Sequence, residues 1–198
     1  MIINTGARTD TVQYFSKWLL NRFAEGYVLA RNPLFPNKVT RYELTPETVD
    51  CVEFCSKNYQ PILKDLHKIT ERFNTHFQYT ITAYGKDIEP GVPSIDESIK
   101  TLLELEKQVG KQRIYWRYDP VLLTKKYTIE RHLKTFEYMA KKLAGHVDRC
   151  IESRDIGAYD TCLNGCKYCY ANQSPQKAFE NYKPQCFCSA ELPAALCF

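Results

Sequence analysis

The stretch VDCVEFCSKNYQPILKDLHKITERFNTHFQYTIT, residues 49–82, decides the fold class of this chain. Runs at 49–55 and 76–82 have the length and the apolar, aromatic composition of buried strands. Between them, residues 59–73 carry apolar side chains at helical spacing and charged side chains on the other side. A strand, a helix and a second strand in this order form the unit from which parallel sheets are built.

The same alternation continues on both sides of this stretch. Ahead of it, the pattern predicts a strand, a helix and a hairpin-like pair of strands, at residues 2–3, 9–25, 27–31 and 39–44. After it, helices and strands follow in turn, at residues 94–109, 113–117, 128–143 and 146–152. About five or six such strands predict an α/β fold, and part of a TIM-type (β/α) barrel rather than an open doubly wound sheet.

Four polar residues stand where predicted strands end, namely Arg8, Asp10, Arg117 and Asp119. Barrel enzymes place their chemistry at the carboxyl ends of strands, so these side chains are candidates for gripping a carboxylate or a ribose of a cofactor. Ion pairs that tie loops together explain them equally well. The alternation of side chains along residues 76–82 also predicts one polar face, which would line a barrel lumen.

Charge and hydropathy argue against several classes of protein. The net charge of +4 is spread along 198 residues without a Lys/Arg block, so a nucleic-acid surface is not supported. No run approaches the roughly 18 apolar residues of a membrane span, and the N-terminus lacks the pattern of a signal peptide, so we expect a cytoplasmic protein. No Walker loop, dinucleotide-binding glycine motif or serine nucleophile elbow is present.

The cysteines are the most informative residues. Nine cysteines cannot all pair within one chain, and cytosolic thiols stay reduced, so their clustering indicates a metal site. Cys162, Cys166 and Cys169 lie within eight residues and can wrap one inorganic centre. Three thiolates on a cubane leave one iron open, and an open position is characteristic of catalytic metal sites.

Two other interpretations of the cysteines remain open. A zinc site would combine Cys166 and Cys169 with Cys186 and Cys188, although the C-x-C spacing of the second pair is uncommon in zinc sites. The thiols of the loop would otherwise carry no ligand. Of the remaining cysteines, Cys51, Cys55 and Cys150 are expected to be buried, and Cys197 to be a thiol of the tail. The four histidines are expected to cap helices or lie on the surface: His67, His76, His132 and His146.

The string CLNGCKYCYAN, residues 162–172, resembles the signature of radical S-adenosylmethionine enzymes, in the form found in spore photoproduct lyase-like members. The resemblance implies a [4Fe-4S] cluster held by Cys162, Cys166 and Cys169, with S-adenosylmethionine on its fourth iron. It also implies a reductant such as flavodoxin or ferredoxin, and leaves the substrate unknown. A non-catalytic iron-sulfur or structural zinc module is the alternative function.

Most of residues 1–175 resembles an uncharacterised, mostly bacterial family of unknown-function barrel proteins, through GYVLARNP at 26–33, YGKDIEP at 84–90, WRYDP at 116–120 and DIGAYDTC at 155–162. Family members carry further barrel strands where this chain runs almost directly from Cys150 into Arg154. The resemblance therefore implies an internal deletion. The expected organisation is a partial barrel over 1–153, an iron-sulfur loop over 154–175 and an irregular tail over 176–198.

Overall fold

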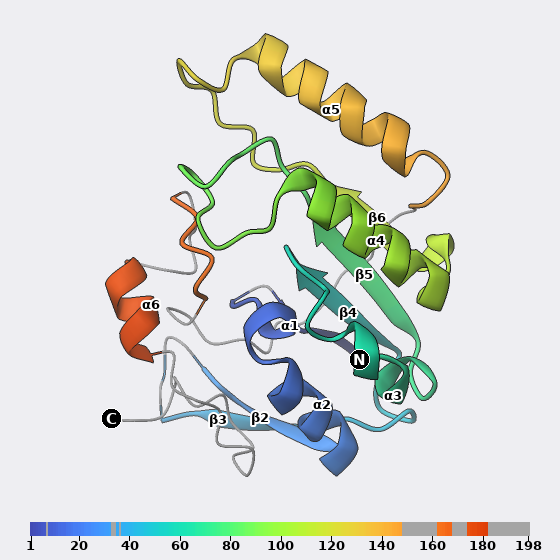
Figure 1. The fold of residues 1–198 in the computed structure, drawn as a ribbon. Helices are drawn as coiled ribbons and strands as arrows, with labels where there is room; N and C mark the ends of the chain where they lie inside the picture. The colour runs from blue at the N-terminus through green and yellow to red at the C-terminus, as the bar shows by residue number, and fades with distance from the viewer. Residues whose placement is uncertain (7, 33–34, 36, 148–161, 168–173, 182–198) are drawn as a thin grey trace.

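A computed structural model describes the chain except for residues 7, 33–34, 36, 148–161, 168–173 and 182–198. Its centre is a four-stranded sheet in which neighbouring strands are all parallel and follow the order β1-β4-β5-β6 (Figure 1). The strands are β1 (Ile2–Asn4), β4 (Cys51–Ser56), β5 (Thr75–Thr80) and β6 (Ile114–Arg117). The predicted α/β class with a parallel sheet is confirmed.

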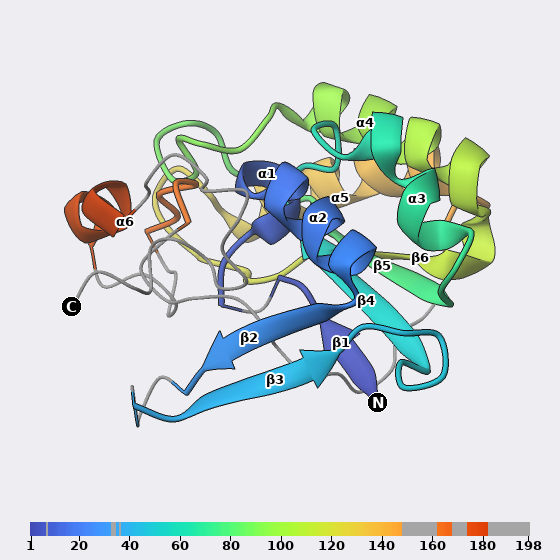
Figure 2. The same ribbon diagram turned by 90° about the horizontal axis from the view of Figure 1, so that it is seen from below.

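The two strands of the predicted hairpin form a sheet of their own. They are β2 (Tyr27–Arg31) and β3 (Val39–Glu43), and they pair antiparallel. Helices lie together on one side of the four-stranded sheet (Figure 2). The helical elements are α1 (Thr11–Tyr14), α2 (Ser16–Glu25), η1 (Leu63–Asp65), α3 (His67–Thr70), α4 (Ile95–Val109), η2 (Lys111–Arg113), α5 (Ile129–Leu143) and, beyond the cysteine loop, α6 (Pro175–Asn181).

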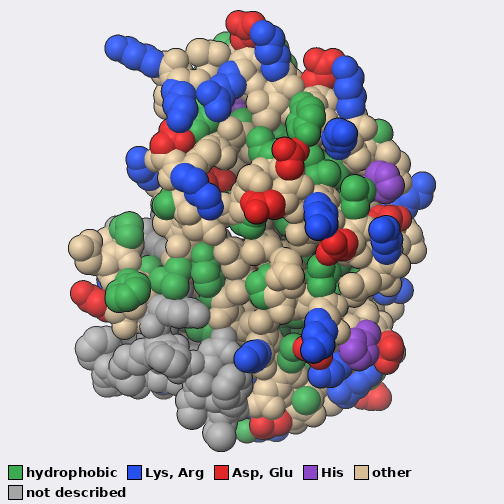
Figure 3. Space-filling view, in the orientation of Figure 1, with side chains coloured by type: hydrophobic (Ala, Val, Ile, Leu, Met, Phe, Trp, Pro, Cys, Tyr) green, Lys and Arg blue, Asp and Glu red, His purple; other side chains and the backbone are tan. Residues whose placement is uncertain are grey.

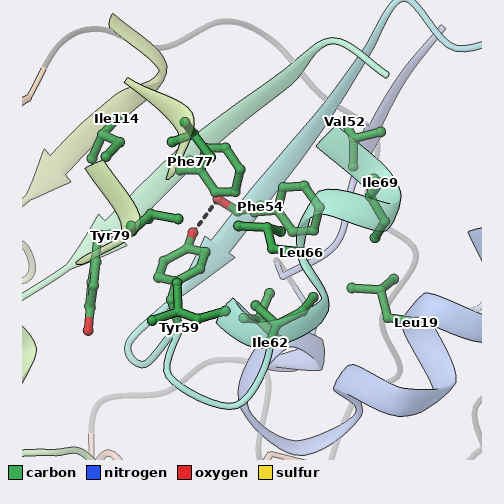
Figure 4. Close-up of a cluster of buried hydrophobic side chains, with 14 of the residues drawn as sticks. Leu19, Val52, Phe54, Tyr59, Ile62, Leu66, Ile69, Phe77, Tyr79 and Ile114 are labelled. Carbon is green, nitrogen blue, oxygen red and sulfur yellow. Dashed lines mark hydrogen bonds between the residues drawn. The ribbon is translucent and has the colours of Figure 1, made fainter. Parts of the chain in front are cut away.

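The alternation of side chains along the strands gives the sheet one apolar and one polar face. On the apolar face, the rings of Phe54 and Phe77 stack at 4.9 Å between centroids, and both side chains are fully buried. Leu19 of α2 and Ile69 of α3 pack over this face (Figure 4). Burial of a large apolar side chain contributes roughly 1.5–3 kcal/mol, so this layer dominates the stability of the fold.

Two helices that the pattern predicts as continuous are broken in the structure. The first divides at Phe15, whose backbone leaves the helical region (φ −129°, ψ 27°) while its ring is fully buried. In the second, over 59–73, the hydroxyl oxygen of Tyr59 lies 2.8 Å from the carbonyl of Phe54 and 2.8 Å from that of Gln78, and its one proton can be donated to either. These contacts fix the start of the segment against the sheet, and only short helical turns follow.

The two long helices agree with the sequence pattern. Ser94 and Glu97 form a capping box at the start of α4, and Gly110 ends this helix with a φ of 81°. Thr128 caps α5 by accepting a hydrogen bond from the backbone of Arg131. Both boundaries follow from capping chemistry that is local in sequence.

The described residues neither confirm nor exclude the predicted barrel. The parallel sheet that they form has four strands, and a closed barrel needs eight. His146 and Val147 are not in a strand, and the rest of the predicted strand at 146–152 lies outside the described residues. The described helices include none that is long and apolar enough to cross a membrane.

Some buried positions differ from expectation. Cys51 and Cys55 are half-buried on the polar face of the sheet rather than packed in the hydrophobic core. His76 and His132 are buried, and not surface groups as predicted. The ring of His132 lies 2.8 Å from the hydroxyl of Tyr118 and 3.2 Å from the carbonyl of Leu122, so neighbouring polar groups account for its burial.

Candidate functional site

The candidate site lies at the carboxyl edge of the parallel sheet, and Asp10 is its centre. Asp10 follows β1 and caps α1, because its Oδ1 accepts from the backbone of Gln13 at 2.9 Å. The hydroxyl of Ser56, the last residue of β4, donates to Oδ1 at 2.7 Å, and the backbone of Lys57 donates to Oδ2 at 3.0 Å. The side chain thus ties together the ends of two neighbouring strands.

The cysteine loop docks onto this edge through Asn164. The side-chain amide of Asn164 donates to Asp10 at 3.4 Å, and its Oδ1 accepts from the hydroxyl of Tyr14 at 3.0 Å. The carbonyl of Asn164 accepts from the backbone of Gly91 at 2.9 Å. In Figure 1 the described part of the loop, drawn in orange, lies beside the green segment that follows β5. Segments about 150 residues apart in sequence therefore meet at one place.

Two glycines permit this close contact. A Cβ on Gly91 would lie 2.6 Å from the Cα of Asn164, a separation that side chains essentially never reach. Gly165 has a φ of 64°, which other residues rarely adopt, and a Cβ there would lie 3.0 Å from the ring of Pro90. Any larger residue at either position would therefore push the loop away from the segment after β5.

A buried ion pair lies at the same edge. The ammonium of Lys57 is 3.0 Å from Glu89, and the two side chains are 14% and 2% exposed. The hydroxyl of Thr82 donates to the other oxygen of Glu89 at 2.9 Å. Buried charges are costly to desolvate, so a pair like this one needs close geometry and further hydrogen bonds.

Of the three predicted ligands, the structure describes Cys162 and Cys166. Cys162 is buried and Cys166 is half-buried. Burial, together with the charges of Asp10 and Cys166, raises the pKa of the Cys162 thiol to about 12, although hydrogen bonds from the backbone of Asn164 and Asp10 act in the opposite direction. Cys169 lies outside the described residues, as do Cys150, Cys186, Cys188 and Cys197.

A metal centre at the loop would need several donor side chains close together. Within the described ranges, no three His, Cys, Asp or Glu side chains form a group that would hold a metal ion. The two described thiols lie on one loop, and the backbone N–H groups of Asn164 and Asp10 hydrogen-bond the buried one. Soft thiolates with backbone N–H donors are the typical surroundings of iron-sulfur clusters. The described residues thus supply two of the three thiols of the predicted set, and the third, Cys169, lies outside the described residues.

A row of polar side chains crosses the polar face of the four-stranded sheet, opposite the face that carries Phe54 and Phe77. Asn4 of β1 donates to Glu53 of β4 at 3.0 Å, and Gln78 of β5 donates to the same carboxylate at 2.6 Å. Arg117 of β6 donates to Oε1 of Gln78 at 3.1 Å and also bonds Asp119 at 2.8 Å. Glu53 is fully buried in this row.

The four polar residues predicted from strand ends do not converge on one point. Asp10 is buried beside the cysteine loop, where burial raises the pKa of its carboxyl against the effect of its hydrogen-bond donors. Arg8 donates to the carbonyl of Arg31 at 3.1 Å, at the end of the hairpin. Arg117 and Asp119 bind each other at the far edge of the polar row.

Sequence reasoning missed Asn164, Glu89 and Glu53. Asn164 and Glu89 lie within the motifs CLNGC and YGKDIEP. These motifs indicated a family resemblance, and nothing in them pointed to these two side chains. Glu53 gave a usable signal, because a carboxylate in the middle of an apolar strand is either paired or functional.

Comparison with known proteins gives a family match without an activity. The family model described as Domain of unknown function (DUF1848) matches residues 2–151 and 148–171. No curated protein and no solved structure matches the chain.

Proposed function

This chain belongs to the family described as Domain of unknown function (DUF1848), and from its own residues we propose that it is an iron-sulfur protein of the radical S-adenosylmethionine type. In this proposal Cys162, Cys166 and Cys169 hold a [4Fe-4S] cluster at the carboxyl edge of the parallel sheet. The observation that carries it is the docking of the cysteine loop at that edge through Asn164, on Asp10 and Gly91.

The position of the loop supports the proposal. In parallel α/β folds, ligands bind at the carboxyl ends of the strands, where loops from several strands come together. Asp10 follows β1, Ser56 ends β4 and Glu89 follows β5, and all three belong to the hydrogen-bond network around the loop or the adjoining ion pair. A metal bound by this loop would thus face side chains from three strands.

The donor chemistry also supports it. Three cysteine ligands leave one iron of a cubane open, and this iron is where S-adenosylmethionine would bind. A cluster of this type supplies one electron to the bound sulfonium compound. The chain's own residues would then have separate tasks: amides near Cys162 stabilise thiolate charge, and Asp10 with Asn164 fixes the loop.

Side chains near the loop are candidates for contacts with cofactor or substrate. Lys57 and Glu89 present opposite charges beside the loop, and Arg117 with Asp119 ends the polar row. Paired charges of this kind can bind the amino and carboxylate groups of a small molecule when they exchange partners.

The internal deletion remains part of the proposal. The family model matches in two segments that meet at residues 148–151, and the sequence predicts the missing part of the barrel close to that point. This agreement supports a shortened barrel. Cluster binding depends on the loop and its docking site, whereas catalysis also depends on how fully the substrate is enclosed.

The test is reductive cleavage of S-adenosylmethionine. The chain is reconstituted anaerobically with iron and sulfide, reduced with dithionite and supplied with S-adenosylmethionine, and 5′-deoxyadenosine is measured by liquid chromatography. We expect product from the wild type and from a Cys51→Ala control, and none from Cys162→Ala, Cys166→Ala or Cys169→Ala. A cluster that forms and does not yield 5′-deoxyadenosine would instead identify a non-catalytic iron-sulfur module.

A further inference from the structure

Exposed apolar side chains are concentrated on one segment. In the described part of the chain, ten large hydrophobic side chains are exposed, and six of them lie between residues 121 and 138, namely Val121, Leu123, Ile129, Leu133, Phe136 and Tyr138. A grouped apolar surface of this kind, bordered by polar residues, marks a site of association, whereas single exposed side chains need no explanation.

Only half of the apolar side of α5 is covered. His132, Met139 and Leu143 are buried, whereas Ile129 and Leu133 are 63% and 64% exposed. Tyr138 donates to Asp96 of α4 from another side of the helix. Figure 1 shows α5 as the outermost helix, with α4 along one side of it. The exposed row therefore lies away from α4.

Two rows of side chains on α5 share the same spacing. The apolar row consists of Ile129, Leu133, Phe136 and Ala140, at successive intervals of four, three and four residues. The charged row beside it consists of Glu130, Lys134, Glu137 and Lys141, at the same intervals and with alternating sign. Intervals of three and four keep each row on one side of a helix. Both rows therefore have the same spacing when counted from either end.

We propose that this face of α5 binds α5 of a second copy of the chain, with the two helices antiparallel about a two-fold axis. Reversal places Ile129 of one copy near Ala140 of the other and Leu133 near Phe136, so large and small side chains face each other in register. A two-fold contact requires a surface that is complementary to itself, and this spacing provides one.

The charged row selects the antiparallel orientation. In that orientation the charged rows of the two copies lie on the same side of the contact, with Glu130 of one copy within about one helical turn of Lys141 of the other and Lys134 within about one turn of Glu137. A parallel pair about a two-fold axis would place the two charged rows on opposite sides of the contact, where they could not pair with each other. The face of the molecule in Figure 3 carries basic and acidic side chains interspersed. The ordered row on α5 thus complements itself in one arrangement.

Sedimentation velocity of the full chain under reducing conditions tests this contact. Over about 1 to 100 µM, a range that brackets weak homodimers, we expect a concentration-dependent shift from monomer to dimer. The variant Lys134→Glu/Lys141→Glu makes the row wholly acidic, and Glu130→Lys/Glu137→Lys makes it wholly basic. Each alone should weaken the dimer by roughly tenfold or more.

Mixing the two variants gives the decisive result, because opposite rows should restore a heterodimer. Recovery on mixing requires folded partners, so it separates loss of the contact from loss of the fold. The control Lys17→Glu/Lys64→Glu changes the net charge equally at exposed positions on other elements and should dimerise as the wild type does. A wild type that stays monomeric throughout, a dimer that survives in either variant, or a mixture that stays monomeric would each overturn the proposal.

Discussion

The hydroxyl of Tyr14 donates to the side-chain oxygen of Asn164 at 3.0 Å, across 150 residues of sequence. Tyr14 ends α1, immediately after the residues that Asp10 caps, and Asn164 stands between the first two cysteines of the loop. Through this bond the first helix of the chain holds the cysteine loop in place.

Tyr14→Phe should loosen the loop without disturbing the core. The hydroxyl of Tyr14 also accepts from the side-chain amide of Gln13 at 3.2 Å, so the variant loses two hydrogen bonds. Each costs about 1 kcal/mol, so the free energy of unfolding should fall by about 1–2 kcal/mol. Bound iron should also be lost faster to a chelator. Tyr42→Phe is the control, since Tyr42 packs on the core from the hairpin. Equal chelation rates for the two variants would contradict a role for Tyr14 in holding the loop.

Asp10 predicts a dependence of stability on pH. Burial raises the pKa of this carboxyl, so the folded state favours its protonated form. Its contribution to stability is therefore complete below the usual aspartate pKa of about 3.9 and is lost as the pH rises through the higher folded-state pKa. Asp10→Asn removes this titration. Urea unfolding from pH about 4 to 7 should show the wild type losing stability relative to the variant, and parallel curves would refute this.

The thiols of the metal-free chain should differ in reactivity. The pKa of Cys162 is raised to about 12, chiefly by burial, so almost none of it is thiolate near neutral pH. Alkylation of Cys162 by iodoacetamide should be slower than that of half-buried Cys166 by roughly tenfold or more. Peptide mass spectrometry over time measures both rates. Equal rates would show that the burial of Cys162 does not protect it.

The Lys57–Glu89 pair should contribute strongly to the stability of the site. Lys57→Met removes the ammonium from a carboxylate that is 2% exposed, and loss of one partner of a buried pair costs about 3–5 kcal/mol. The double variant Lys57→Met/Glu89→Gln removes both charges and should recover much of this loss. Chemical denaturation measures each variant. A single variant as stable as the wild type would show that the pair is unimportant.

Local chemistry made much of the fold predictable. Capping residues set the two ends of α4, with Ser94 and Glu97 at its start and Gly110 at its end. The alternation of apolar Phe77 with polar Gln78 predicted which face of β5 each side chain occupies. The breaks within 9–25 and 59–73 were not predictable, because they depend on contacts distant in sequence. Tyr59, for example, is fixed by carbonyls of two strands.

The site was predictable only in part, for a similar reason. The spacing of Cys162, Cys166 and Cys169 identified the loop, but no periodicity places Asn164 against Asp10. Asp10 stood out as a strand-end residue, and the structure shows it buried as an anchor for the loop. Arg117 and Asp119 also stood out as strand-end residues, and the structure shows them bound to each other.

The most direct test of the account is the iron and sulfide content of the anaerobically reconstituted and desalted chain. The account predicts about four iron and four sulfide per chain, the content of one cubane, and loss of both in the Cys162→Ala/Cys166→Ala/Cys169→Ala variant. A chain that takes up only zinc or no metal, or a variant that retains the same iron and sulfide, would contradict it.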